Sequence, residues 1–263
     1  MNLIHICVSY NKNYINLLRL LLLSIKKYTS LEGVHIAITA CNDLQPLTAE
    51  LIKELHIPHV KVYPATNRAI EYRPGHDARL LDAASQKMLL LEHIEDSYDK
   101  ILYLDTDILM TGDLSPVFDI ELDHKLHALP EGRIQLMKAG PWGGMFFRNH
   151  RSHLGKPGIN TGILLYNNCP EIRDLFKQTM HHIYKYLKTT RRIPGCKEQP
   201  FLVFNSVINE MCETSILPKY AMLHPKPHPE EIIKLINHFS GWVGNDKYKI
   251  KKMEMFFNKH IRI

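Results

Sequence analysis

Apolar positions in the first hundred residues follow two alternating patterns, which predict strands and helices in turn. Short apolar runs typical of buried strands cover residues 3–9, 34–40, 59–65 and 100–110. Longer stretches with apolar residues on one helical face lie between them, at residues 14–28, 46–57 and 77–94. Because strands that alternate with helices usually pair in parallel, this part of the chain predicts a largely parallel sheet covered by helices.

Beyond Asp113 the alternation becomes irregular. The pattern predicts strands at residues 125–131, 161–167 and 236–241, a short strand within 216–223, and helices at 171–188 and 199–211. A polar stretch at residues 132–158 is long for a loop, which is typical of a functional or mobile segment. No repeat or linker interrupts the chain. We therefore expect one α/β domain over residues 1–263, with a central mixed, mostly parallel sheet flanked by helices.

Composition narrows the function classes. The 263 residues are 45% apolar, as expected for a chain with a real core, and the formal net charge of +6 is mildly basic. No basic run is interleaved with aromatic residues, so we expect no nucleic-acid partner. The N-terminus lacks a leader pattern, and the apolar run at residues 17–25 is too short to span a bilayer. The five cysteines form no CxxC motif, which favours free thiols over a zinc site. Free thiols are typical of a reducing compartment, so we expect a soluble, cytoplasmic protein.

The C-terminal segment, residues 247–263, mixes lysines with methionine, phenylalanine and isoleucine. One interpretation is an amphipathic helix that makes peripheral contact with an anionic membrane. The other is a helix packed on the domain with a solvated basic face, which is the commoner arrangement and the one we expect. The pattern leaves both a monomer and a homodimer open.

Two carboxylates interrupt the apolar run at residues 100–110, where a lone buried charge would be costly. Asp105 and Asp107 are two residues apart, so on an extended chain they point to the same side and can share a divalent cation. His238 is a candidate third ligand, because a flexible Ser-Gly pair follows it. Oxygen ligands suit Mg²⁺ or Mn²⁺, and the imidazole favours Mn²⁺. The alternative is structural: Asp105 ends the strand and Asp107 makes local turn hydrogen bonds.

A resemblance to a known family adds to this picture. The stretch "YDKILYLDTDILMTGDLSPVF" resembles the donor-site signature of glycosyltransferase family 8, the glycogenin-like enzymes. Five further elements occur in the family's order along the chain, one before this stretch and four after it: "ICVSYNKNY", "INTGILLYN", "EQPFLVFN", "LPKY" and "HFSG". The resemblance implies a GT-A (Rossmann-like) fold, a UDP-sugar donor, Mn²⁺ with Mg²⁺ as the alternative, and transfer with retention. It further implies a nucleotide-binding half at residues 1–110 and an acceptor- and sugar-binding half at residues 111–263.

The resemblance also implies a role for each matching residue. Asp105, Asp107 and His238 would bind the metal, and Gln199, Glu198 and Lys87 would form the catalytic group. The donor would be held by Val8, Ser9, Tyr10 and Tyr14 at the uridine, Thr106 at the ribose, Glu131, Asn160, Thr161 and Gly162 at the sugar, and Gly241 and Lys247 near the diphosphate.

Some of these assignments have rivals. Lys87 competes with Arg79 for the basic position and with a simple solvated helix face, and Tyr14 would serve equally as a core aromatic. Glu198 stands where the family has aspartate. The family's Lys-Pro-Trp after its His-x-x-Gly is absent, which leaves Lys247 or the backbone amide of Gly244 for the phosphate contact.

The resemblance therefore implies a metal-dependent retaining glycosyltransferase that moves a hexose, glucose first among the candidates, from a UDP-sugar to an unidentified glycan, protein or small-molecule acceptor. One alternative is a non-catalytic nucleotide-sugar or glycan-binding module on the same fold. A nucleotidyltransferase would be expected to carry a glycine-rich phosphate loop after the first strand, and residues 7–14 contain no glycine. The sequence does not select the sugar, the acceptor or self-glycosylation.

Overall fold

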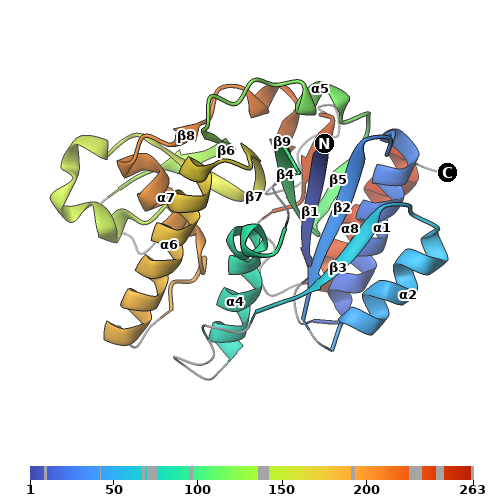
Figure 1. Cartoon of the computed structure of the whole chain (residues 1–263), viewed down its shortest axis with the longest axis horizontal. Coiled ribbons are helices and arrows are strands. Elements are labelled where there is room, and N and C mark those ends of the chain that lie inside the picture. Colours follow the sequence, from blue (N-terminus) through green and yellow to red (C-terminus); the bar gives the residue numbers. More distant parts are fainter. Residues whose placement is uncertain are drawn as a thin grey trace.

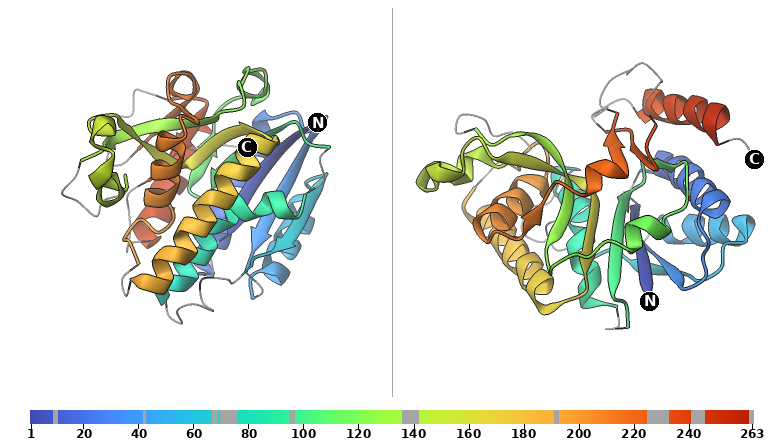
Figure 2. Two further views of the ribbon diagram at one scale, coloured as in Figure 1. Left: turned by 60° about the vertical axis from the view of Figure 1, so that its left-hand side comes forward. Right: turned by 90° about the horizontal axis from the view of Figure 1, so that it is seen from above.

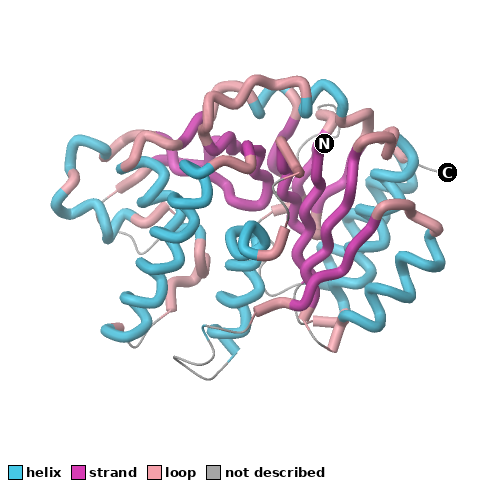
Figure 3. The backbone as a smooth tube through the Cα atoms, in the orientation of Figure 1, coloured by secondary structure: helices cyan, strands magenta, loops and turns pink. Residues whose placement is uncertain are grey.

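The computed structural model describes residues 1–263 apart from 9–10, 42, 67–68, 70–75, 95–96, 136–141, 191–192, 225–232, 241–245 and 262–263. Its centre is a sheet of seven strands (Figures 1 and 3). In spatial order these are β3 (Val60–Pro64), β2 (Val34–Ala40), β1 (Asn2–Val8), β4 (Lys100–Asp105), β7 (Pro157–Asn167), β6 (Leu126–Arg133) and β8 (Cys212–Glu213). β3, β2, β1 and β4 run parallel, β7 is antiparallel to both of its neighbours, and β8 is parallel to β6, so the predicted mixed sheet is confirmed.

Helices cover both faces of this sheet (Figures 1 and 2). One side carries α1 (Asn13–Tyr28), α2 (Gln45–Leu55) and α8 (Asp246–His260), and the other carries α4 (His76–Leu89), α6 (Pro170–Thr189) and α7 (Gln199–Ile208). A short helix, α5 (Ser115–Phe118), follows the β4 region. The predicted helix at residues 77–94 is shorter than expected, because its last turn is the 3₁₀ segment Leu90–Glu92.

Alternation along the strands divides the core into two layers. In β1, Ile4 and Ile6 pack toward α1 and α2, whereas Leu3 and Cys7 pack toward α4. β4 repeats this division, with Leu102 and Leu104 on the α1 side. Tyr103, and by the same alternation Asp105, therefore face the α4 side, which is where the pocket described below opens.

The prediction of one continuous strand over residues 100–110 is wrong. β4 ends at Asp105, the chain turns at Thr106 and Asp107, and β5 (Ile108–Met110) begins a second sheet of order β5-β10-β9. The other strands of this small sheet are β10 (Ile236–His238) and β9 (Ala221–Leu223). β4 thus ends at Asp105, as the structural alternative for the two carboxylates predicted. The turn also brings Asp107 next to β10, a strand from near the end of the sequence.

The C-terminal helix packs on the domain, as preferred above. Met253 and Phe257 of α8, and Ile261 directly after it, are buried with Leu17 of α1 and other apolar side chains. None of the helices in the described part of the chain is both long and apolar enough to cross a bilayer. All five cysteines are unbridged, in agreement with the sequence-based expectation of free thiols.

Candidate active site

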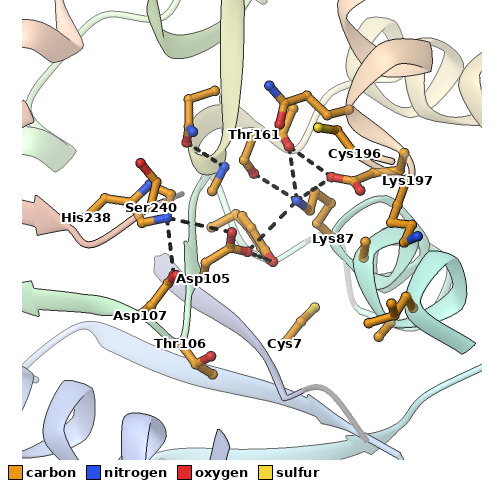
Figure 4. Close-up of a pocket in the computed structure, with 18 of the residues that line it drawn as sticks. Cys7, Lys87, Asp105, Thr106, Asp107, Thr161, Cys196, Lys197, His238 and Ser240 are labelled. Atoms are coloured by element: carbon orange, nitrogen blue, oxygen red, sulfur yellow. Dashed lines mark hydrogen bonds and ion pairs between the residues drawn. The ribbon is translucent and has the colours of Figure 1, made fainter. Parts of the chain in front are cut away.

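A pocket of about 360 Å³ opens at the carboxyl ends of β1 and β4, the edge where open α/β sheets usually bind ligands (Figure 4). Distant parts of the chain meet there. β1 contributes Cys7, which pairs with Asp105 in the β1–β4 register, and β10 contributes His238. α4 presents Lys87 from the side, and the start of α7 supplies Gln199.

Asp105, Asp107 and His238 line this pocket as a compact cluster. Their ligand atoms lie within 4.8 Å of one another. His238 Nε2 is 3.2 Å from Asp107 Oδ1 and 4.0 Å from Asp105 Oδ2. The backbone N–H of Phe239 donates to the carbonyl of Asp107 at 2.9 Å, which fixes β10 against the turn between β4 and β5. The second sheet therefore brings residue 238 next to residue 107.

Gly162 of β7 makes this approach geometrically feasible. A Cβ on Gly162 would lie 2.3 Å from His238 Cε1 and 2.7 Å from Asp105 Oδ2, distances that atoms cannot adopt without a shift. The missing side chain leaves the imidazole and the carboxylate facing one gap. Two carboxylates and an imidazole around such a gap fit a divalent cation of the Mn²⁺ type.

Lys249 of α8 also reaches the cluster, and its Nζ lies 2.5 Å from Asp107 Oδ2. Burial by itself would raise the pKa of Asp107, but the charges of Lys249 and His238 hold that pKa below its ordinary value. Burial would likewise lower the pKa of Lys249, and the charge of Asp107 raises it instead. Asp107 is therefore an ionised carboxylate with a cationic partner already in place.

A second charged group joins α4 to the start of α7. Lys87, only 2% exposed, donates to Glu198 Oε1 at 2.7 Å and to the carbonyl of Thr161 at 2.9 Å. The Thr161 hydroxyl donates to the same Glu198 oxygen at 2.9 Å. Burial would lower the pKa of Lys87, but the charges of Glu198 and Asp105 raise it, so the ammonium stays charged. Its Nζ is 3.9 Å from Asp105 Oδ1, which places it between the metal cluster and the α7 end (Figure 4).

A third group orients Gln199. Glu131 Oε2 accepts from Gln199 Nε2 at 3.0 Å and from Asn160 Nδ2 at 3.3 Å. Gln199 Nε2 also donates to the carbonyl of Ile159 at 2.9 Å. Since both partners are acceptors, the amide nitrogen must face them, and the amide oxygen of Gln199 is turned away from them.

Most residues predicted for the site line this pocket: Lys87, Asp105, Thr106, Asp107, Glu131, Asn160, Thr161, Gly162, Glu198, Gln199, His238 and Tyr14. Arg79, the rival of Lys87, is exposed on α4 and does not line it. The side chain of Val8 is buried in the α1 core layer, so any ligand contact from Val8 would come from its backbone. Lys247 is exposed on α8, and Lys249 stands in the pocket where the sequence suggested Lys247. Ser9, Tyr10, Gly241 and Gly244 lie outside the described residues.

Sequence reasoning missed several pocket residues, among them Cys7, Tyr103, Cys196, Lys197, Ser240 and Lys249. Two of them had a signal. Tyr103 precedes Asp105 by two residues, so it shares its face of the strand, and its hydroxyl donates to Asp105 Oδ1 at 2.5 Å. Lys249 precedes Met253 and Phe257 at steps of four, which places it on the buried stripe of α8.

Known proteins resemble this chain in their family profile and in their fold. Residues 5–239 match the profile described as Glycosyl transferase family 8. No curated protein matches the chain in sequence. The crystal structure of galactosyltransferase LgtC in complex with donor and acceptor sugar analogues is similar at a TM-score of 0.66 and 15% identity, over 100% of this chain and 97% of that one.

Two further structures are similar. Apo mouse xyloside xylosyltransferase 1 has a TM-score of 0.61 and 13% identity, over 90% of this chain and 96% of that one. Apo glycosyltransferase GlyE of Streptococcus pneumoniae has a TM-score of 0.59 and 15% identity, over 98% of this chain and 63% of that one. At these identities the likeness shows the fold alone, and it confirms the predicted GT-A architecture.

Proposed function

This chain belongs to glycosyltransferase family 8, and we propose that it transfers a hexose, glucose first among the candidates, from a UDP-sugar to an acceptor hydroxyl with retention of anomeric configuration. The observation that carries the proposal is the cluster of Asp105, Asp107 and His238 at the carboxyl ends of the strands, beside Lys87 and Lys249. A buried arrangement of this kind is suited to a divalent cation and a diphosphate together, because neither ion alone balances the charge.

The metal site is where the donor's leaving group would be held. Asp105, Asp107 and His238 would bind Mn²⁺, with Mg²⁺ as the alternative, and the cation would act as a Lewis acid toward the leaving UDP. Lys249 adds a cation on the α8 side of Asp107 and would contact the diphosphate, the role that the sequence suggested for Lys247. Tyr14, Thr106 and Ser240 line the same pocket and would contact the nucleoside and ribose.

The sugar would lie toward β7 and α7. Asn160, Thr161 and Glu131 offer hydrogen-bonding groups to sugar hydroxyls. Gln199 turns its amide oxygen away from Glu131 and Ile159, so this oxygen is available to stabilise positive charge at the anomeric carbon. An amide is a weak nucleophile, and we therefore favour attack by the acceptor on the face that UDP leaves, within a short-lived ion pair, over a stable covalent intermediate.

The fold does not select the sugar. The neighbours named above include a galactosyltransferase and a xylosyltransferase, at similar TM-scores. We expect the choice to depend on the hydroxyl contacts around Glu131 and Glu198, because hexoses such as glucose and galactose differ in the orientation of a single hydroxyl.

The test is UDP release from a panel of UDP-glucose, UDP-galactose, UDP-N-acetylglucosamine and UDP-xylose, with Mn²⁺ and with EDTA. We expect slow Mn²⁺-dependent hydrolysis of one hexose donor, with at least a hundredfold loss in Asp107→Asn. Asp113→Asn is the matched control, because Asp113 is an exposed carboxylate outside the pocket. Tight donor binding without UDP release, also in the presence of candidate acceptors, would favour the non-catalytic binding module instead.

A further inference from the structure

Both carboxylate oxygens of Asp107 face nitrogen atoms of the chain. Its Oδ1 faces His238 Nε2 at 3.2 Å, and its Oδ2 faces Lys249 Nζ at 2.5 Å. Asp107 is 7% exposed and Lys249 is 9% exposed, so little water screens the pair. A cation that uses Asp107 as a ligand has to enter a position where an ammonium group already neutralises the carboxylate.

The fold places Lys249 there through the packing of α8. Lys249, Met253 and Phe257 follow one another at steps of four, so they lie on the same helical face. Met253 and Phe257 are buried with Leu17 and Phe239, and Phe239 directly follows His238. The apolar contacts of α8 therefore hold the ammonium at the cluster of Asp105, Asp107 and His238.

We propose that Lys249 is an internal counter-cation that occupies Asp107 in the metal-free protein and moves to the donor diphosphate when the cation binds. The inference rests on the proposed metal-dependent function. A divalent cation on Oδ1 of Asp107 and the ammonium group on Oδ2 would repel each other, so we expect the cation to weaken the hold of Asp107 on Lys249. A charged group leaving a buried partner needs a new one, and the diphosphate is the anion that the donor brings.

This arrangement makes the metal and the nucleotide depend on each other. Without a nucleotide, a cation that pushes Lys249 away from Asp107 leaves the ammonium group without a diphosphate to contact, so we expect the cation alone to bind weakly. When UDP is present, Lys249 gains the diphosphate, so each ligand strengthens the other by the same factor. The lysine thereby keeps the site from holding a metal that carries no donor.

The experiment is a Mn²⁺ titration of the full chain, followed by the electron paramagnetic resonance signal of free Mn²⁺, with and without UDP. Lys249→Met removes the ammonium and keeps the length of the side chain. Lys251→Met makes the same change of charge on an exposed position of the same helix and is the control. We expect Lys249→Met to bind Mn²⁺ alone at least tenfold more tightly than the wild type. We also expect UDP to strengthen its Mn²⁺ binding at least tenfold less than in the wild type, with Lys251→Met within twofold of the wild type throughout.

A second measurement on the wild-type protein does not depend on how a variant folds. Acetylation of Lys249 relative to Lys251, read by mass spectrometry, should rise severalfold when saturating Mn²⁺ is added and fall again when UDP follows. Two results would overturn the inference: unchanged acetylation of Lys249, or Lys249→Met binding Mn²⁺ alone no more tightly than the wild type. Either would show that the ion pair only anchors α8. The proposed function would still stand if Mn²⁺ bound in the presence of UDP. A wild type that bound no Mn²⁺ even with UDP would overturn both.

Discussion

A single missing side chain controls the metal cluster. Gly162 borders both His238 and Asp105, and a Cβ would stand 2.3 Å from the imidazole. Gly162→Ala should therefore weaken Mn²⁺ binding in the presence of UDP at least tenfold. It should also lower the free energy of unfolding by about 1–3 kcal/mol, as overpacking usually does. Titration of Mn²⁺ and urea unfolding measure the two effects.

Gly195→Ala is the control for that substitution. Gly195 also lines the pocket, but a Cβ there would meet no atom within 4 Å. It should change neither Mn²⁺ affinity nor stability measurably. Equal Mn²⁺ affinity in Gly162→Ala and the wild type would show that the three ligands do not converge on one ion.

A buried histidine beneath the pocket makes stability depend on acid. Burial, together with the charge of Lys87, lowers the pKa of His5 from 6.5 to about 3. The unfolded chain takes up a proton that the folded protein cannot, so stability falls as pH drops below 6.5 and is lost progressively down to about 3. The contribution of His5 should fall by roughly 2 kcal/mol between pH 7 and pH 5.

The measurement is urea unfolding against pH for the wild type and for His5→Gln, which keeps a hydrogen-bonding group near Thr39. The difference between the two curves isolates residue 5 from the other titrating groups. His181→Gln, at an exposed position, should run parallel to the wild type. Parallel curves for His5→Gln as well would mean that His5 binds protons equally in the folded and unfolded chain, against the lowered pKa.

Site residues could be predicted from the sequence where their chemical type stands out from its surroundings. Asp105 and Asp107 could be recognised because carboxylates in an apolar run need a cation, and Gly162 because a glycine in an apolar strand suggests close approach. Composition alone does not single out Lys249, since lysines crowd the C-terminal segment. Its spacing of four from Met253 and Phe257, which are buried, is the signal that it faces inward.

At the level of elements, the Lys87–Glu198 pair ties α4 to the start of α7 across β7. Lys87→Met leaves Glu198 buried without its cation and should destabilise the protein by about 3–5 kcal/mol. Lys87→Met combined with Glu198→Met should lose less than the sum of the two single changes, by about 0.5–3 kcal/mol. Urea unfolding of the four proteins completes the cycle.

The ion pair between Arg19 and Glu54 is the comparison for this cycle. It joins α1 to α2 with short contacts of 2.5 and 2.6 Å, but both side chains are substantially exposed. Water and salt screen it, so its coupling should be far smaller than that of the buried pair. Similar couplings in the two cycles would mean that Lys87 and Glu198 are solvated in solution.

Element boundaries were predictable where one apolar pattern dominated. The helix predicted at residues 14–28 and the strand at residues 34–40 match α1 and β2 closely, because their apolar faces alone determine them. The turn at Thr106 and Asp107 could not be predicted, because apolar residues flank it on both sides. It follows from pairing of β5 with β10, two segments more than a hundred residues apart, and local sequence carries no record of that contact.

At the scale of the whole molecule, the division into residues 1–110 and 111–263 does not produce two cores. β7 lies between β4 and β6 in one sheet, and Leu104 of the first half packs in the same cluster as Ile163 of the second. We therefore expect a single unfolding transition, seen alike by far-UV circular dichroism and by tryptophan fluorescence.

The site draws ligands from both halves, so UDP with Mn²⁺ should stabilise that one transition as a unit. At concentrations a hundredfold above Kd, linkage adds about 2.7 kcal/mol, or roughly 5–10 °C in Tm for a chain of this size. EDTA should abolish the shift, and two transitions of which only one responds to UDP would show that the halves fold separately.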